Sequence, residues 1–165
     1  MWRMIYISAM SAVVQHLLRR ARDFEYSMKL CRDTSLDTEV QLVNTGIPKS
    51  NESLQSAALL GIHAAISYAD ALRIGLGDPE LSADDHKRAV RRLEKAIPVK
   101  RIQDKTGIQQ FNALMGNKTA IAYGKGRISD NDLKSIVESS QRFSAWINRL
   151  GKELNVEGWG NVAAE

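Results

Sequence analysis

The strongest constraint on the fold is the spacing of apolar residues between Asn51 and Leu76. They recur every three or four positions, which is the period of an amphipathic helix. Alanine and glycine are frequent on this face, so a neighbouring backbone can approach it closely. We therefore expect a central, buried helix that ends at the turn sequence GLGDP. Its apolar positions are Leu54, Ala58, Gly61, Ile62, Ala65, Ala69, Leu72 and Leu76.

Two more helices flank this central one in the sequence. The first spans about Ser11 to Arg32, with Ser11 as its N-cap residue. The other follows the sequence SADD, residues 82–85, which has the pattern of a capping box. We expect that helix to continue to about Ile97, where Pro98 stops it.

Two further helices are predicted near the C-terminus. One runs from about Ile108 to Tyr123 and is followed by two glycines. A second capping-box sequence, SDND at residues 129–132, precedes the last helix. Gly151 lies where a C-cap glycine is expected.

These segments predict one all-α domain at residues 11–151. Long amphipathic helices favour an antiparallel up-and-down bundle of four main helices plus a shorter helix. Residues 1–10 are then an N-terminal extension, and residues 152–165 are a C-terminal tail that either docks or frays. The polar stretch 34–50 contains Gly46 and Pro48 and is predicted to be a long loop insertion.

Charge and cysteine content narrow the classes of partner and compartment. The net charge of +4 permits contact with nucleic acid or an acidic partner but does not require it. The single cysteine, Cys31, excludes an internal disulfide and a cysteine-cluster metal site. No apolar run approaches the roughly 20 residues that span a bilayer, so we expect a cytoplasmic protein without membrane contact.

The helix after residue 85 carries a dense group of cations. One interpretation is a solvated helix face, partly paired with Asp84, Asp85 and Glu94. The other is a surface that binds nucleic acid phosphates, although no aromatic residues lie among the cations to stack on bases. The cations are Lys87, Arg88, Arg91, Arg92 and Lys95.

Four polar residues form a second candidate cluster: His63, Ser67 and Asp70 share one side of the central helix, and His86 begins the next. Two histidines and a carboxylate could hold a metal, but no paired metal-ligand spacing such as HExxH occurs. We therefore expect a buried, hydrogen-bonded polar network, without a metal or another cofactor.

Three stretches together resemble the HEPN superfamily of prokaryotic helical bundles, and in particular its small stand-alone bacterial members. They are AALLGIHAAISYADALRIGLGD, DDHKRAVRRLEKAIP and AYGKGRISDNDLKSIVESSQRFSAWINRL. The resemblance implies a four-helix bundle with one shorter helix, often dimeric. Many members are ribonucleases in which an arginine is followed, after four to six residues, by a histidine. The arginine binds phosphate, and the histidine exchanges a proton with the ribose 2′-hydroxyl.

This chain departs from that motif. None of His16, His63 and His86 has an arginine at the required distance upstream. The aligned positions are Lys118 and Tyr123. Lysine lacks the bidentate fork of arginine, and tyrosine, with a pKa of about 10, is a poor base at neutral pH. The pair therefore looks like a degenerate catalytic site.

The resemblance then implies a non-catalytic binding module that acts through a protein partner. A toxin-antitoxin component or a nucleotidyltransferase would fit as that partner, and self-association into a homodimer would accompany it. Two alternatives remain open. One is an RNA- or DNA-binding module that uses the basic third helix. The other is a divergent ribonuclease that uses Lys118 and Tyr123.

Overall fold

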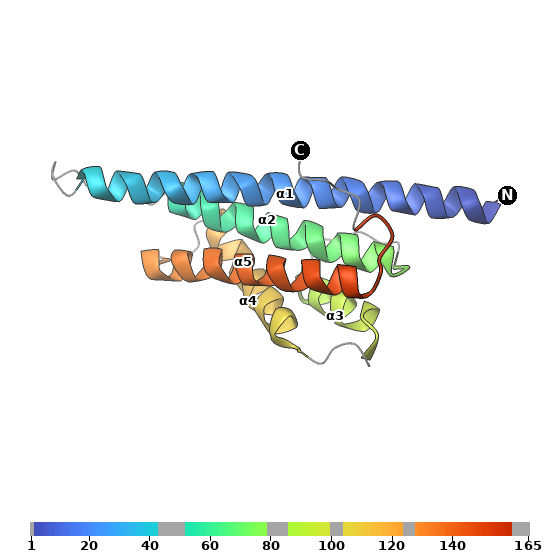
Figure 1. Ribbon diagram of the computed structural model, residues 1–165. Coiled ribbons are helices and arrows are strands. Elements are labelled where there is room, and N and C mark those ends of the chain that lie inside the picture. The colour runs from blue at the N-terminus through green and yellow to red at the C-terminus, as the bar shows by residue number, and fades with distance from the viewer. Residues whose placement is uncertain (1, 43–51, 79–85, 100–103, 124–127, 160–165) are drawn as a thin grey trace.

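The computed structural model describes residues 2–42, 52–78, 86–99, 104–123 and 128–159. These residues form helices and no strand, so the all-α prediction is confirmed. Figure 1 shows α1, α2 and α5 side by side with nearly parallel axes, while α4 crosses obliquely beside α5. The helices are α1 (Trp2–Leu42), α2 (Glu52–Gly75), α3 (His86–Ala96), α4 (Thr106–Tyr123) and α5 (Asp130–Glu153).

The central helix is α2, which contacts each of the other four helices. Its alanine-rich face is buried, as the sequence predicted. Gly61 lies at a close contact, where the side chains of Met28 on α1 and Ser140 on α5 would be the first atoms met by an added Cβ. A glycine here lets three helices approach one another closely.

The first helix is much longer than predicted. It runs without a break from Trp2 to Leu42, so Ser11 lies inside it and is not an N-cap. The prediction of a loop from residue 34 was therefore wrong up to Leu42, and residues 43–50 lie outside the described part of the chain. The stretch from Trp2 to Leu42 contains no glycine or proline, and Thr34 Oγ1 donates to the carbonyl of Leu30 at 2.9 Å, which satisfies this hydroxyl within the helix.

This long helix projects beyond its neighbours at both ends (Figure 1). A helix that leaves the packed body has no neighbour to select apolar residues at every third or fourth position. The apolar period that marks Ser11 to Arg32 therefore stops before the helix does.

Helix α2 ends in a Schellman motif, and this turn positions the candidate site. The amide of Gly77 donates to the carbonyl of Ile74 at 2.9 Å, and the amide of Asp78 donates to that of Arg73 at 2.9 Å. Gly77 has a φ of 98°, a conformation that glycine adopts without steric cost. The turn brings Asp78 back over the last turn of its own helix, beside Arg73.

Helix α5 begins and ends with recognisable caps. Ser129 and Asp132 form the predicted capping box. The helix continues past Gly151, however, and its C-cap is Leu154, so the prediction of Gly151 as the C-cap residue was wrong. Asn155, with a φ of 50°, occupies the left-handed position that follows.

Residues 154–159, which follow α5, dock on the helices. Val156 lies against Gly75, and the Trp159 ring lies against Gly151, so each glycine leaves room for a side chain from this turn. Trp159 is only 2% exposed. The absence of a side chain at Gly151 therefore allows the Trp159 ring to pack on α5. Residues 160–165 lie outside the described part of the chain.

The remaining helix ends agree with the sequence where they are described. Helix α3 ends at Ala96, just before Pro98, and α4 ends at Tyr123. The predicted capping box at residues 82–85 lies outside the described residues.

Among the described residues, α2 is long and apolar enough by composition to cross a membrane, contrary to the expectation that no such run occurs. However, 78% of its most apolar window is buried against the other helices. Such burial is compatible with the core helix of a soluble protein.

Candidate functional site

Helix α3 has two opposite faces. Because successive residues turn by about 100° around a helix, four of its cations fall within an arc of about 100°. The other side packs into the core, where Leu93 is fully buried. The cations are Arg88, Arg91, Arg92 and Lys95, and the buried residues are Ala89, Val90, Leu93 and Ile97.

Three of these cations are exposed, namely Arg88, Arg91 and Lys95. Arg91 and Lys95 make no ion pair with any residue that the structure describes. The side chain of Lys87, predicted to belong to the same group, lies outside the described part.

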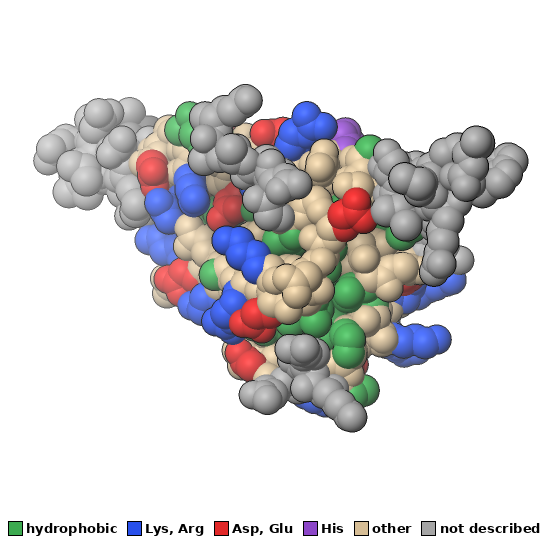
Figure 2. Space-filling model, turned by 45° about the vertical axis from the view of Figure 1, so that its right-hand side comes forward, with side chains coloured by type: hydrophobic (Ala, Val, Ile, Leu, Met, Phe, Trp, Pro, Cys, Tyr) green, Lys and Arg blue, Asp and Glu red, His purple; other side chains and the backbone are tan. Residues whose placement is uncertain are grey.

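Some other exposed cations have acidic neighbours, whereas Arg19 and Lys152 have none among the described residues. Arg142 lies 3.4 Å from Glu138, and Arg149 lies 3.8 Å from Glu153. Figure 2 shows one face of the molecule, on which basic and acidic side chains are interspersed. Arg91 and Lys95 are distinguished by their place on one face of α3, which they share with Arg88.

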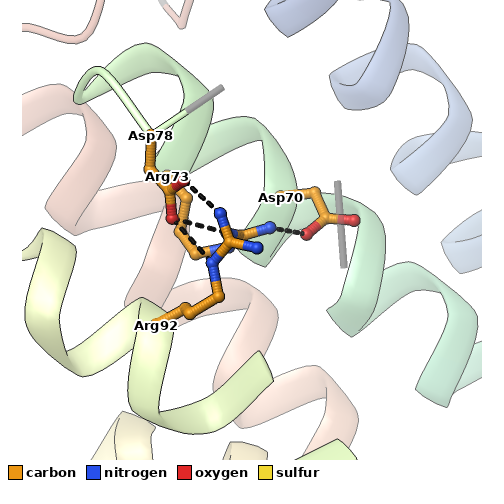
Figure 3. A network of polar contacts seen from close by, with 4 residues as sticks. All are labelled: Asp70, Arg73, Asp78 and Arg92. Carbon is orange, nitrogen blue, oxygen red and sulfur yellow. Dashed lines mark hydrogen bonds and ion pairs between the residues drawn. The ribbon is translucent and has the colours of Figure 1, made fainter. Parts of the chain in front are cut away.

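Arg92 turns inward and holds the carboxylate of Asp78 (Figure 3). Its Nε donates to Asp78 Oδ2 at 3.0 Å, and its Nη2 donates to Asp78 Oδ1. Both oxygens of the carboxylate are thus bound by one guanidinium, which is the strongest geometry for such a pair. This contact joins α3 to the end of α2.

A second arginine lies behind the same carboxylate. Arg73 Nη1 donates to Asp78 Oδ2 at 2.7 Å, and Arg73 Nη2 donates to Asp70 Oδ1 at 2.5 Å. The side chain of Arg73 is fully buried, and that of Asp70 is 8% exposed. Two carboxylates and two arginines therefore form one network, which compensates the cost of burying the Arg73 charge.

The network also fixes the ionisation of Asp78. Hydrogen bonds from Arg92, together with the charge of Arg73, lower the pKa of the Asp78 carboxyl below its usual value. Asp78 therefore remains a carboxylate at neutral pH, and the orientation of Arg92 is maintained.

A hollow of about 590 Å³ opens between the end of α2 and α3. Its α2 side is formed by Leu76, Gly77 and Asp78, and its α3 side mainly by Arg88, Arg92 and Lys95. Among the described residues that line it, none is aromatic. The hollow can therefore offer charge and hydrogen-bond donors, but no ring on which a base could stack.

The described members of the second predicted cluster, His63, Ser67 and Asp70, do not hydrogen-bond to one another. His63 is half-buried and its ring lies 5.4 Å from that of Phe24, while Asp70 pairs with Arg73. Within the described residues, no hydrogen bond joins His63 to Ser67 or Asp70. Ser67 is 4% exposed, and the side chain of His86 lies outside the described part.

His63 instead belongs to a small group at the contact of α1, α2 and α4. The guanidinium carbon of Arg20 lies 5.4 Å from the centre of the Phe24 ring, on which His63 packs. Burial lowers the pKa of His63, and the charges of Lys118 and Arg20 lower it further. His63 is therefore a neutral imidazole at physiological pH.

Lys118 and Tyr123, which were predicted to form a degenerate catalytic site, lie on different sides of α4. Lys118 is half-buried, whereas Tyr123 is 76% exposed near the end of α4. Five positions on a helix place two side chains about 140° apart around the axis. Among the described residues, no group of three histidine, cysteine or acidic side chains could hold a metal ion.

Arg73 and Asp78, which anchor the site, were not predicted from the sequence. The signal was present in the sequence LRIGLGD. Once Gly77 is recognised as the left-handed residue of a Schellman motif, Asp78 becomes the residue that contacts position 73. That contact is usually apolar, so an arginine and an aspartate at these positions predict an ion pair.

Comparison of this chain with protein-family models, with curated proteins and with solved structures found no match.

Proposed function

We propose that this chain is a non-catalytic binding module that holds nucleic acid through the exposed basic face of α3. The observation that carries the proposal is that Arg91 and Lys95 are exposed and have no acidic partner among the described residues. Cations in this position can neutralise phosphates and release counterions, which is the main source of affinity in sequence-independent binding.

The geometry of α3 suits this role. Its apolar side and the Arg92–Asp78 contact hold the helix against the body, so the outward cations are presented by a rigid element. Arg88 and Lys95 are separated by about 10 Å along the axis. That length corresponds to about three phosphates along one strand.

The expected mode of binding is sequence-independent. Phosphate contacts fix position but carry no sequence information, and no aromatic residue lines the hollow beside α3. We therefore expect similar affinities for single strands of unrelated sequence.

The test is the affinity for a fluorescent single-stranded RNA in buffer of low salt, measured by anisotropy. Arg91→Glu combined with Lys95→Glu should lower the affinity strongly. Arg19→Glu combined with Lys152→Glu makes the same charge change at exposed positions on α1 and α5 and is the matched control. No binding at low salt, or equal losses in the two double variants, would refute the proposal.

The absence of catalysis is part of the proposal. It is supported by the exposure of Tyr123 and by its angular separation from Lys118. RNA cleavage that survives purification and disappears in Tyr123→Phe would favour the divergent ribonuclease instead.

The proposal retains a HEPN-like identity and a cytoplasmic location. It treats α1, α2, α4 and α5 as the four main helices of an antiparallel up-and-down bundle, with α3 as the shorter one. The alternation of helix directions along the chain in Figure 1 supports this arrangement. The three sequence stretches that resemble the superfamily support the identity.

A second candidate function is binding to a protein partner, of the toxin-antitoxin or nucleotidyltransferase kind, or to a second copy of the chain. The observation that favours it is on α1, where Tyr26 is 65% and Leu30 is 51% exposed, one turn apart. Large exposed apolar side chains are common at protein interfaces.

A pull-down of the tagged chain from its native cell extract, with and without nuclease, separates the two functions. A stoichiometric protein that stays bound after nuclease, and is lost in Tyr26→Ser combined with Leu30→Ser, would support the second. Release of all bound material by nuclease would support the first.

A further inference from the structure

We propose that the hollow between α2 and α3 is a binding site for a terminal phosphate group, carried by a nucleotide-sized ligand or by the end of a nucleic acid strand. This inference rests on the proposed function and deepens it, because it assigns a specific phosphate to a specific place beside the basic face.

The size of the hollow fits such a ligand. Its volume of about 590 Å³ lies within the range of about 300–1,000 Å³ that is typical of small-molecule sites. One wall is the turn Leu76–Asp78, whose backbone is held by the hydrogen bonds of the Schellman motif. The opposite wall is α3, whose apolar side is buried in the core.

The chemistry of the lining selects an anion. Arg88, Arg92 and Lys95 line the hollow, and Asp78 is its one acidic lining residue among those described. Asp78 is already bound by Arg92 and by the buried Arg73, so its charge is compensated from two sides. Lys95 has no acidic partner among the described residues and adds a further positive charge.

A phosphate is favoured over a carboxylate for two reasons. A terminal phosphate carries close to two negative charges near neutral pH, and its three outer oxygens can accept hydrogen bonds from several cations at once. Arg88, Arg92 and Lys95 supply several donors from α3, while the amides of the facing turn are already bonded within the Schellman motif. A base or another flat apolar group would find no aromatic ring in this lining.

The arrangement separates two sets of cations on α3. Lys95 lines the hollow, whereas Arg91 is exposed and does not line it. Arg91 is thus available to the backbone of a bound strand, while Lys95 serves both the strand and the terminal phosphate.

The test is isothermal titration calorimetry of the full chain with sodium pyrophosphate at constant ionic strength. We expect saturable binding, weakened roughly tenfold in Lys95→Gln and in Arg88→Gln, since each loses one charge-assisted hydrogen bond. Arg91→Gln and the distant Lys152→Gln should bind like the parent chain. Inorganic phosphate, and RNA with a 5′-phosphate compared with a 5′-hydroxyl, then distinguish a small ligand from a strand end.

The outcomes separate this inference from the proposed function. Pyrophosphate binding without any RNA binding would preserve the phosphate site and refute the nucleic acid function. RNA binding together with no saturable pyrophosphate binding would refute the phosphate site alone. Pyrophosphate binding that is equally strong in Lys95→Gln and Arg88→Gln would also overturn it, because the ligand would then lie elsewhere.

Discussion

Arg92 on α3 donates hydrogen bonds to both carboxylate oxygens of Asp78, which lies just beyond the end of α2. One of these oxygens also accepts from the fully buried Arg73. This relationship anchors a strongly basic helix to the core, while Arg88, Arg91 and Lys95 are exposed. It explains why Arg92 differs from its neighbours in the same charge run.

The first prediction concerns removal of the shared charge. Asp78→Asn should lower the free energy of unfolding by about 3 kcal/mol, because Arg73 would remain buried with one ionic partner fewer. Asp33→Asn, at an exposed carboxylate paired only with a neighbour in the sequence, should change it by about 0.5 kcal/mol or less. Urea denaturation of both variants measures the difference. Similar small effects at the two positions would show that the network contributes little.

The second prediction is a pH dependence of stability with a defined sign. The pKa of Asp78 in the folded state is lowered from 3.8. The carboxylate therefore makes its full contribution to the free energy of unfolding above pH 3.8. The contribution is lost as the pH falls below 3.8 through the lower folded pKa. The difference in unfolding free energy between the parent chain and Asp78→Asn should therefore shrink in acid. A difference that grows in acid would contradict the assignment.

The third prediction concerns Tyr68, whose hydroxyl donates to Glu25 Oε2 at 3.0 Å. Burial, with a smaller contribution from the Glu25 charge, raises the pKa of Tyr68 from 10.0 to about 12. The neutral phenol therefore stabilises the fold fully below pH 10, and this stabilisation is lost as the pH rises toward 12. Relative to Tyr68→Phe, the parent chain should lose roughly 3 kcal/mol over this interval. If the free energy of unfolding changes equally with pH in the parent chain and in Tyr68→Phe, this role for Tyr68 is ruled out.

The fourth prediction tests the docked C-terminal turn. In Gly151→Ala the new methyl group would collide with the Trp159 ring, so the free energy of unfolding should fall by about 1–3 kcal/mol. The matched control is Gly116→Ala on α4, where no atom lies near the added group. That variant should be more stable by about 0.5–1 kcal/mol, the usual helical gain from glycine to alanine.

A double variant completes this test. When Trp159→Ala removes the ring, Gly151→Ala should no longer be destabilising, because the two residues are in direct contact. If Gly151→Ala costs the same with and without Trp159, the turn does not pack on α5 as described.

The sequence predicted the packed helices better than the projecting one. Helices α2 to α5 bury a face, so apolar spacing, Pro98 and the Ser129 capping box located them. The ends of α1 project beyond the body, and their helical state follows from the absence of glycine and proline, not from an apolar period. Polar residues after Thr34 therefore looked like a loop although the backbone remains helical.

Only part of the candidate site could be predicted from the sequence. The basic run on α3 could be read directly, but the role of Arg92 depends on a partner fourteen positions upstream across a turn. Gly151 was misread for a similar reason. Its position suits a C-cap, and only the tertiary contact with Trp159 shows that it provides space. His63 and Asp70 share a helix side, yet each pairs with a different neighbour, Phe24 and Arg73.

The measurement that tests the central claim most directly is the salt dependence of RNA binding by the parent chain and by Arg91→Glu combined with Lys95→Glu. If Arg88, Arg91 and Lys95 each neutralise one phosphate, the logarithm of the association constant should fall with that of the salt concentration with a slope of about −2 for a single strand. The double variant should bind weakly, with a slope of about −0.7, because only the Arg88 contact remains. Undetectable binding of the parent chain at low salt, or an unchanged slope in the double variant, would contradict a nucleic acid function for α3.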